Sequence, residues 1–204
     1  MELILDSLAL FQKGGPVMYL IAACSLIVAA IAVERFQYYR EMSTDTGSLL
    51  ERLIPVLEQE NWQEASQICE QAKGVTAQLA LKGIKQLAAG NCALESVLEG
   101  EAALAASRLR ENLRHLDSIV TIAPLLGLLG TVVGMIQSFS VLNVKTGQPL
   151  AITGGVGEAL VATASGLCVA VFAMVIYSYF NHRLDSLVTN MEQICVILAG
   201  QAKR

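Results

Sequence analysis

Three long stretches without charged residues constrain the fold of this chain more than any other feature. They cover residues 14–33, 118–144 and 146–182, and only Glu158 interrupts the third. About 20 consecutive apolar residues cross the hydrocarbon core of a bilayer as an α-helix, so each stretch is long enough. We therefore expect an all-α integral membrane protein with three transmembrane helices, of which the second and third extend into a helical cytoplasmic domain.

The composition supports a membrane protein and argues against other classes. The mean hydropathy is +0.53, and 16% of the 204 residues are charged, against about 25% in soluble domains. A net charge of −4 without a basic stripe argues against a nucleic-acid partner. The five cysteines form no CxxC pair and have no neighbouring histidine, so we expect neither a disulfide framework nor a metal site. With two histidines and no catalytic constellation, we expect no enzyme and no cofactor.

The distribution of basic residues predicts the orientation. Of the 14 Lys and Arg residues, only Lys13 and Lys145 lie outside 34–117 and the segment after 182. Because basic residues accumulate in the cytoplasm, we expect the N-terminus outside and the C-terminus inside. The expected segments are an external amphipathic helix (1–15), the first span (16–34), a cytoplasmic helical domain (35–117), the second span (118–144), an external loop (145–150), the third span (151–182) and a cytoplasmic C-terminal helix (183–204).

The segment between the first two spans has the pattern of amphipathic helices. Apolar spacing predicts helices at 48–60, 62–73 and 75–89, with Asn61 capping the second and Gly74 closing it. A fourth helix, from about residue 93, meets no breaker after Gly100 and should run straight into the second span. The apolar positions of 183–198 also repeat at helical spacing, so this segment should pack on a partner helix.

Glu158 is the most informative single residue. It lies 8 residues, or about 12 Å of helix, beyond Leu150. A carboxylate at that depth is costly and normally faces a bundle interior, a partner or water. The alternative is a side chain near the outer end of the span that reaches for lipid headgroups.

Two threonines lie at matching depth in the second and third spans. Thr131 precedes Val144 by 13 residues and Thr163 follows Leu150 by 13, so both fall roughly 20 Å of helix from the external loop. Hydroxyls level with one another on neighbouring helices could line a polar passage. Threonines in membrane helices also bond their own i−4 carbonyl and then serve only in packing.

Small residues form a face on each of these spans. Such faces allow the close approach of helices, and Gly130 and Gly134 make a GxxxG packing motif. The faces serve either simple helix–helix contact or the surrounding of another helix. Pro124, Gly127, Thr131, Gly134 and Ser138 lie on the second span, and Glu158, Ala162, Ser165, Gly166 and Ala173 on the third.

Two motifs in these spans resemble the MotA/TolQ/ExbB proton-channel family. The first is APLLGLLGTVVGM at 123–135, and the second is GEALVATASGL at 157–167, which is similar to the family's G-x-EAL-x-AT-x-GL signature. The convincing match covers about residues 107–185. Three spans and a short chain point to the ExbB/TolQ branch, because flagellar stator subunits of the MotA type have four spans.

The resemblance implies an ion-driven motor subunit in the bacterial inner membrane, with its N-terminus in the periplasm. Such proteins form a homo-oligomeric ring, of five subunits in ExbB-like cases, around single-span ExbD/TolR-like partners with an intramembrane Asp. A TonB/TolA-like protein is a further partner that the resemblance admits. Thr131 and Thr163 match the family's pore threonines and Glu158 its pore glutamate, which either receives the ion or sets the local potential.

Two other functions compete with a motor that couples proton-motive force to work on the envelope, such as TonB-dependent outer-membrane transport. One is a non-motor membrane scaffold, in which the glycine faces only oligomerise the chain. The other is a solute transporter. Three spans give no inverted repeat and no pair of broken helices, which argues against it.

Overall fold

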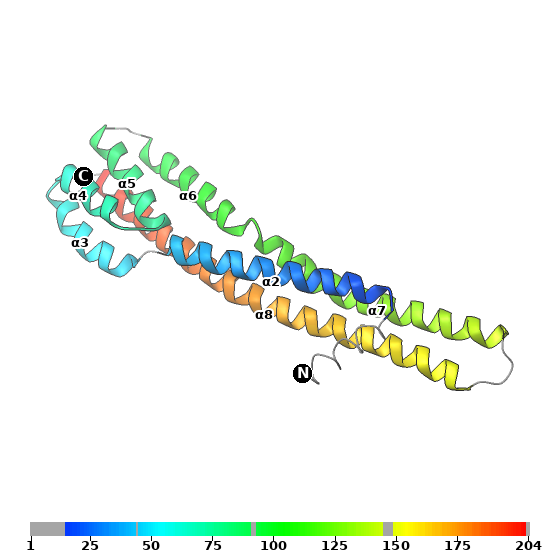
Figure 1. Cartoon of the computed structure of the whole chain (residues 1–204). Helices are drawn as coiled ribbons and strands as arrows, with labels where there is room; N and C mark the ends of the chain where they lie inside the picture. The colour runs from blue at the N-terminus through cyan, green and yellow to red at the C-terminus, as the bar shows by residue number, and fades with distance from the viewer. Residues whose placement is uncertain (1–14, 44, 91–92, 145–148, 203–204) are drawn as a thin grey trace, which may run out of the picture. The chain divides into compact units, whose positions relative to one another are not determined.

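A computed structural model describes residues 15–43, 45–90, 93–144 and 149–202. Within these ranges the only regular secondary structure is seven α-helices, as Figure 1 shows. The expected all-α fold is therefore confirmed. Most of the expected N-terminal helix (1–15) and of the external loop (145–150) lies outside the described residues.

The chain divides into two compact units. One unit comprises the chain up to Val33 together with Leu113–Ser178. The other comprises Glu34–Asn112 together with the chain from Tyr179 onward.

The first unit contains the apolar parts of three long helices. The three helical runs that include α2, α7 and α8 are long and apolar enough to cross a membrane, which confirms the three transmembrane helices. Large apolar side chains on these helices point outward, as with Leu26 (73% exposed) and Phe172 (69% exposed). Such exposure suits contact with lipid. The helices span Val17–Met42 (α2), Leu113–Val144 (α7) and Pro149–Ala202 (α8).

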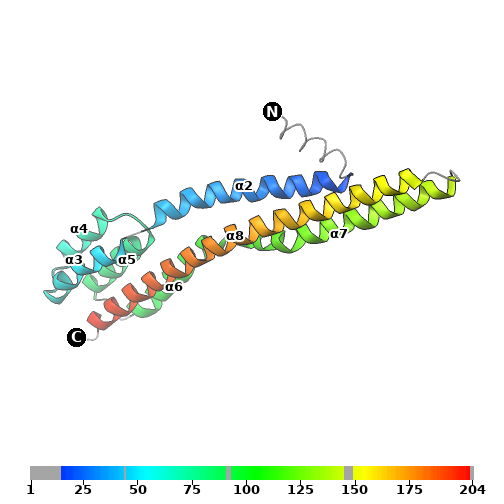
Figure 2. The ribbon, with the colours of Figure 1, turned by 90° about the horizontal axis from the view of Figure 1, so that it is seen from below.

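Within this unit, α7 and α8 lie side by side and antiparallel (Figures 1 and 2). Glycines make their close approach possible. A Cβ atom on Gly166 would lie 2.6 Å from the carbonyl oxygen of Ala123, where no side chain fits. Gly157, nine residues earlier on α8, instead has open space around the position of a Cβ atom.

The second unit is a small helical domain. Leucines are frequent in its core, and Gly83 lets α5 approach the leucines of its neighbours. A Cβ on Gly83 would lie 2.5 Å from Leu198 Cδ1 and 2.9 Å from Leu98 Cδ2. The C-terminal part of α8 thus packs within its own chain through the apolar stripe expected for 183–198. The other helices of this unit are α3 (Thr46–Glu58), α4 (Trp62–Gln71), α5 (Val75–Ala88) and α6 (Leu94–Arg110).

Local capping explains where these helices begin. The Asn61 side chain accepts a hydrogen bond from the Glu64 amide, as expected for the cap of α4. The Asp45 side chain does the same for the Ser48 amide, so α3 begins at Thr46, two residues before the expected start. Gly74, with φ of 106°, stands at the start of α5 rather than at the end of α4.

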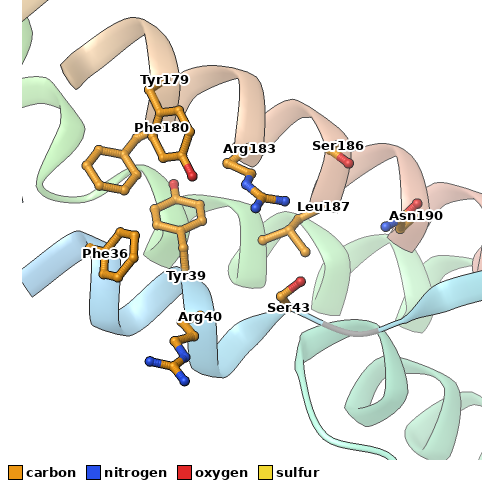
Figure 3. Close-up of a pocket in the computed structure, with 10 residues that line it drawn as sticks. All are labelled: Phe36, Tyr39, Arg40, Ser43, Tyr179, Phe180, Arg183, Ser186, Leu187 and Asn190. Carbon is orange, nitrogen blue, oxygen red and sulfur yellow. The ribbon is translucent and has the colours of Figure 1, made fainter. Parts of the chain in front are cut away.

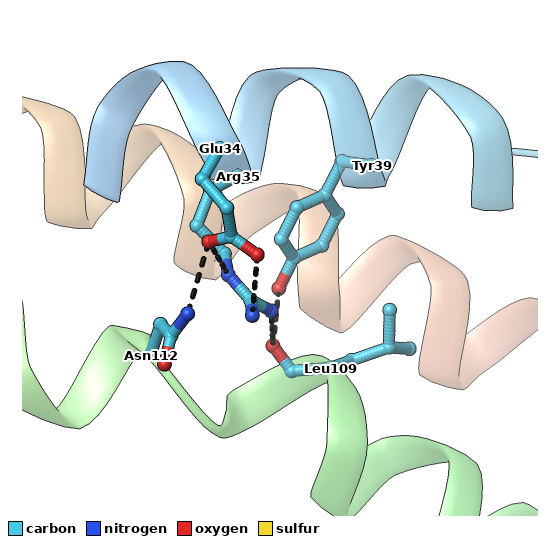
Figure 4. Close-up of polar contacts among 5 residues, drawn as sticks. All are labelled: Glu34, Arg35, Tyr39, Leu109 and Asn112. Atoms are coloured by element: carbon cyan, nitrogen blue, oxygen red, sulfur yellow. Dashed lines mark hydrogen bonds and ion pairs between the residues drawn. The ribbon is translucent and has the colours of Figure 1, made fainter. Parts of the chain in front are cut away.

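The expectation of an uninterrupted helix from residue 93 into the second span is wrong. A turn at Glu111 and Asn112 separates α6 from α7. The Leu109 carbonyl accepts hydrogen bonds from Tyr39 Oη at 3.0 Å and from Arg35 Nη1 at 3.3 Å (Figure 4). These donors replace the next turn of helix as partners of that carbonyl.

Arg35 is itself held in place at this turn. The residue is 4% exposed, and Glu34 accepts two hydrogen bonds from its guanidinium group, of 2.8 and 3.1 Å. Asn112 donates a hydrogen bond of 3.0 Å to the Glu34 carboxylate. A buried arginine needs such partners, because an unpaired buried charge is strongly destabilising.

A matched pair of glycine substitutions tests the α7–α8 contact. We expect Gly166→Ala to destabilise the protein by about 1–3 kcal/mol, because the added methyl group meets backbone atoms. Gly157→Ala should be neutral or slightly stabilising, since alanine favours helix over glycine by about 1 kcal/mol. Thermal unfolding of the purified protein in detergent measures both changes, and equal effects of the two substitutions would contradict the packing described.

Cys69 should be unreactive in the folded protein. Burial raises the pKa of the Cys69 thiol to about 11, and the residue is 2% exposed. Because the thiolate is the reactive form, maleimide at pH 7.5 should leave Cys69 unmodified until the protein is denatured. A Gln71→Cys variant, at an exposed position of the same helix, is the reactive control. Peptide mass spectrometry distinguishes the sites, and equal labelling of both in folded protein would refute the expectation.

Candidate functional site

Thr163 connects the third span to the second. Its Oγ1 donates a hydrogen bond of 2.9 Å to the Gly127 carbonyl on α7 and lies 3.4 Å from the Ala159 carbonyl of its own helix. The cross-helix bond is possible because Gly127 has no side chain. A Cβ there would lie 3.0 Å from Thr163 Cα. The Thr163 hydroxyl therefore forms a polar contact between two otherwise apolar helices.

Thr131 lies one turn further along α7. In an α-helix the Gly127 carbonyl is the ordinary acceptor for the amide of residue 131, so the two threonines are about one turn apart in depth. Thr131 Oγ1, however, donates to the Leu128 carbonyl of its own helix at 2.6 Å. The two threonines are thus not level, as their spacing predicts, and their hydroxyl groups have different acceptors.

Glu158 lies on a different side of α8. A Cβ placed on Gly15 would lie 2.6 Å from Glu158 Oε1, so the carboxylate occupies the space beside that glycine. Gly15 has φ of 70°, and its carbonyl accepts the Met18 amide in the first turn leading into α2. The positive end of a helix dipole favours a carboxylate at such a place.

The three predicted pore residues therefore do not form one cluster within the subunit. Glu158 and Thr163 are 5 residues apart in the sequence, which is about 140° around a helix. The Thr163 side chain contacts α7, whereas Glu158 contacts the segment that precedes α2. In a single subunit the acid and the hydroxyls are separate groups.

The predicted small-residue faces lie mainly at the α7–α8 contact. Gly130 faces Ala162, Gly134 faces Ala159, and Gly166 faces Gly127 and the Ala123 carbonyl. Pro124 within α7 and Ser165 on α8 are partly buried.

Sequence reasoning does not identify Gly15 and Val17 as neighbours of the site. Val17 lies against the position of a Cβ on Gly130, at 3.8 Å. The Gly-Gly-Pro run at 14–16 is a turn signal immediately before the first span, and it is the one local hint of this arrangement.

The polar groups of this arrangement can exchange hydrogen bonds with a proton carrier. Among the described residues no group of His, Cys, Asp and Glu side chains could hold a metal ion. Hydroxyl groups can donate and accept hydrogen bonds, so Thr131 and Thr163 suit either protonation state of a neighbouring acid. Glu158 is the one carboxylate in the sequence between Asp117 and Asp185.

Comparison with known proteins agrees with the motifs in α7 and α8. A putative biopolymer transport protein ExbB homolog of Methanothermobacter thermautotrophicus is 30% identical over 188 residues, which are 92% of this chain and 67% of that protein. The biopolymer transport protein exbB1 of Vibrio cholerae is 30% identical over 170 residues, which are 80% of this chain and 74% of that protein. The sequence profile of the MotA/TolQ/ExbB proton channel family matches residues 71–193. The chain therefore belongs to the MotA/TolQ/ExbB proton channel family, in its ExbB-like branch.

Proposed function

We propose that this protein is the channel-forming subunit of an ion-driven motor in the bacterial inner membrane. It forms a homo-oligomeric ring of five subunits around single-span ExbD/TolR-like helices, each with an intramembrane Asp. The motor couples proton-motive force to work on the cell envelope, such as TonB-dependent outer-membrane transport through a TonB/TolA-like protein. The observation that carries this proposal is the α7–α8 hairpin, where Thr163 bonds across to Gly127 one turn from Thr131.

The shortage of acids in the membrane supports a separate partner. One subunit offers Glu158 and two hydroxyl groups, which do not make a continuous path for a proton. An Asp on a partner helix supplies the missing titratable group. When that Asp takes up a proton from the periplasmic side, it loses its charge and the cost of burying it, so the partner helix moves past the apolar wall.

The exposed faces of the hairpin support an oligomer. Leu125 and Leu128 on α7 are each 58% exposed, and Leu160 on α8 is 62% exposed. The glycine faces are already occupied in the contact between α7 and α8. Ring contacts therefore use the large apolar side chains, and lipid covers the remainder.

Either of two alternative roles for Glu158 suits its position beside Gly15. It receives the ion on the periplasmic side, or it sets the potential that the ion experiences. Glu158→Asp separates them, because a shorter carboxylate keeps the charge but changes the distance over which a proton transfers. A potential role predicts coupling near the wild-type level, and a relay role predicts a marked loss.

Three substitutions test the motor. Thr131→Val, Thr163→Val and Glu158→Ala should each abolish proton flux into liposomes that contain the complex with its single-span partner, while the mass of the complex stays unchanged. Removal of the hydroxyl or carboxylate takes away the polar groups on which transfer depends. In cells, uptake of a TonB-dependent substrate should be lost in parallel.

Thr189→Val is the matched control. Thr189 lies outside the predicted spans, and its Oγ1 donates a hydrogen bond of 2.9 Å to the Asp185 carbonyl of the same helix. It should leave flux and uptake unchanged. Wild-type flux in all three site variants, or a purified homo-oligomer without a pore or single-span partner, would favour the non-motor scaffold.

A further inference from the structure

The second unit contains a cavity of about 530 Å³ between the end of α2 and α8 (Figure 3). It is lined by Phe36 and Arg40 from α2, by Ser43 directly after α2, and by Tyr179, Arg183 and Asn190 among the residues from α8. The cavity is separate from the threonines and from Glu158, and the proposed motor mechanism does not use it.

The cavity changes character from one end to the other. Its aromatic end, with Phe36 and Tyr179, lies next to the predicted ends of the first and third spans at 34 and 182. Tyr and Trp are enriched at this level of a membrane, where an aromatic ring meets the headgroups. Ser43 and Asn190 follow Phe36 and Tyr179 by 7 and 11 residues, so the polar end lies further from the predicted spans.

Two arginines line this cavity. Arg183 extends from α8 toward α2, and Arg40 lies at the α2 rim with its guanidinium group directed away from α8 (Figure 3). Both are exposed, and within the described ranges neither guanidinium group takes part in an ion pair. Asp185, the next acid on α8, accepts a hydrogen bond from Asn181 and is not among the lining residues.

We propose that this cavity binds the phosphate headgroup of an anionic phospholipid from the cytoplasmic leaflet. Arginine donors match phosphate oxygens in geometry and charge, and Ser43 and Asn190 offer further polar groups to the headgroup. The acyl chains leave along Phe36 and Tyr179 toward the bilayer. Basic pockets between membrane helices on the cytoplasmic side are suited to anionic lipids, because that leaflet carries the negative surface charge.

The test uses the purified full-length complex in detergent. Native mass spectrometry measures retention of phosphatidylglycerol against phosphatidylcholine with the same acyl chains. Wild type should prefer phosphatidylglycerol, and Arg40→Gln with Arg183→Gln should weaken its binding about tenfold to thirtyfold. Arg114→Gln is the matched control, since Arg114 is exposed beside the corresponding end of the second span and outside the cavity. It should keep the preference.

A second variant leaves the charges intact. Ser186→Trp fills the cavity, so phosphatidylglycerol retention should fall although both arginines remain. Wild-type retention in both the double arginine variant and Ser186→Trp would overturn the proposal. The proposal would also be wrong if inorganic phosphate alone stabilised the complex as much as phosphatidylglycerol does. A variant that changes the mass of the complex but not its lipid preference would likewise overturn it, since the cavity would then be a contact between subunits. Lipid retention is read without proton flux, so this test fails or succeeds independently of the motor.

Discussion

The close approach of α7 and α8 is the constraint on which the rest of the membrane unit depends. Glycines at the contact allow the backbones to meet, and Gly127 in particular opens its carbonyl to the Thr163 hydroxyl at 2.9 Å. Without a hydrophobic driving force between helices in lipid, such packing and an interhelical hydrogen bond are what hold two spans together. The same contact fixes the depth of Thr163 relative to Thr131. Structure and candidate chemistry therefore rest on the same few small residues.

The spans and several helix ends could be predicted from the sequence because they depend on local signals. Uncharged runs define the three membrane helices, and Asn61 caps α4 by its own side chain. The turn between α6 and α7 could not be predicted, because it depends on donors from Arg35 and Tyr39, about 70 residues away in the sequence. Helical propensity around Glu111 gives no sign of it.

The candidate site divides in the same way. The types of Thr131, Glu158 and Thr163 and their positions along two helices can be read from the sequence. The expected equal depth of the two threonines is not found, because Thr163 bonds to Gly127, about one turn from Thr131. The Thr163 hydroxyl faces α7, whereas the Glu158 carboxylate lies beside Gly15. This separation depends on how the start of the first span packs against α8, which is tertiary structure that the sequence pattern does not contain. In the second unit, Arg40 and Arg183 are 143 positions apart in the sequence, and only folding places them around one cavity.

The contact between Gly15 and Glu158 has a consequence for how the protein tolerates change. The Glu158 carboxylate occupies the space that a side chain at position 15 would need, and the positive φ of Gly15 already disfavours other amino acids. Gly15, which has no side chain, thereby determines whether the Glu158 carboxylate has space beside it. A substitution of Gly15, just before the first helix, would then have the same effect as a mutation of Glu158, although the carboxylate itself is still present.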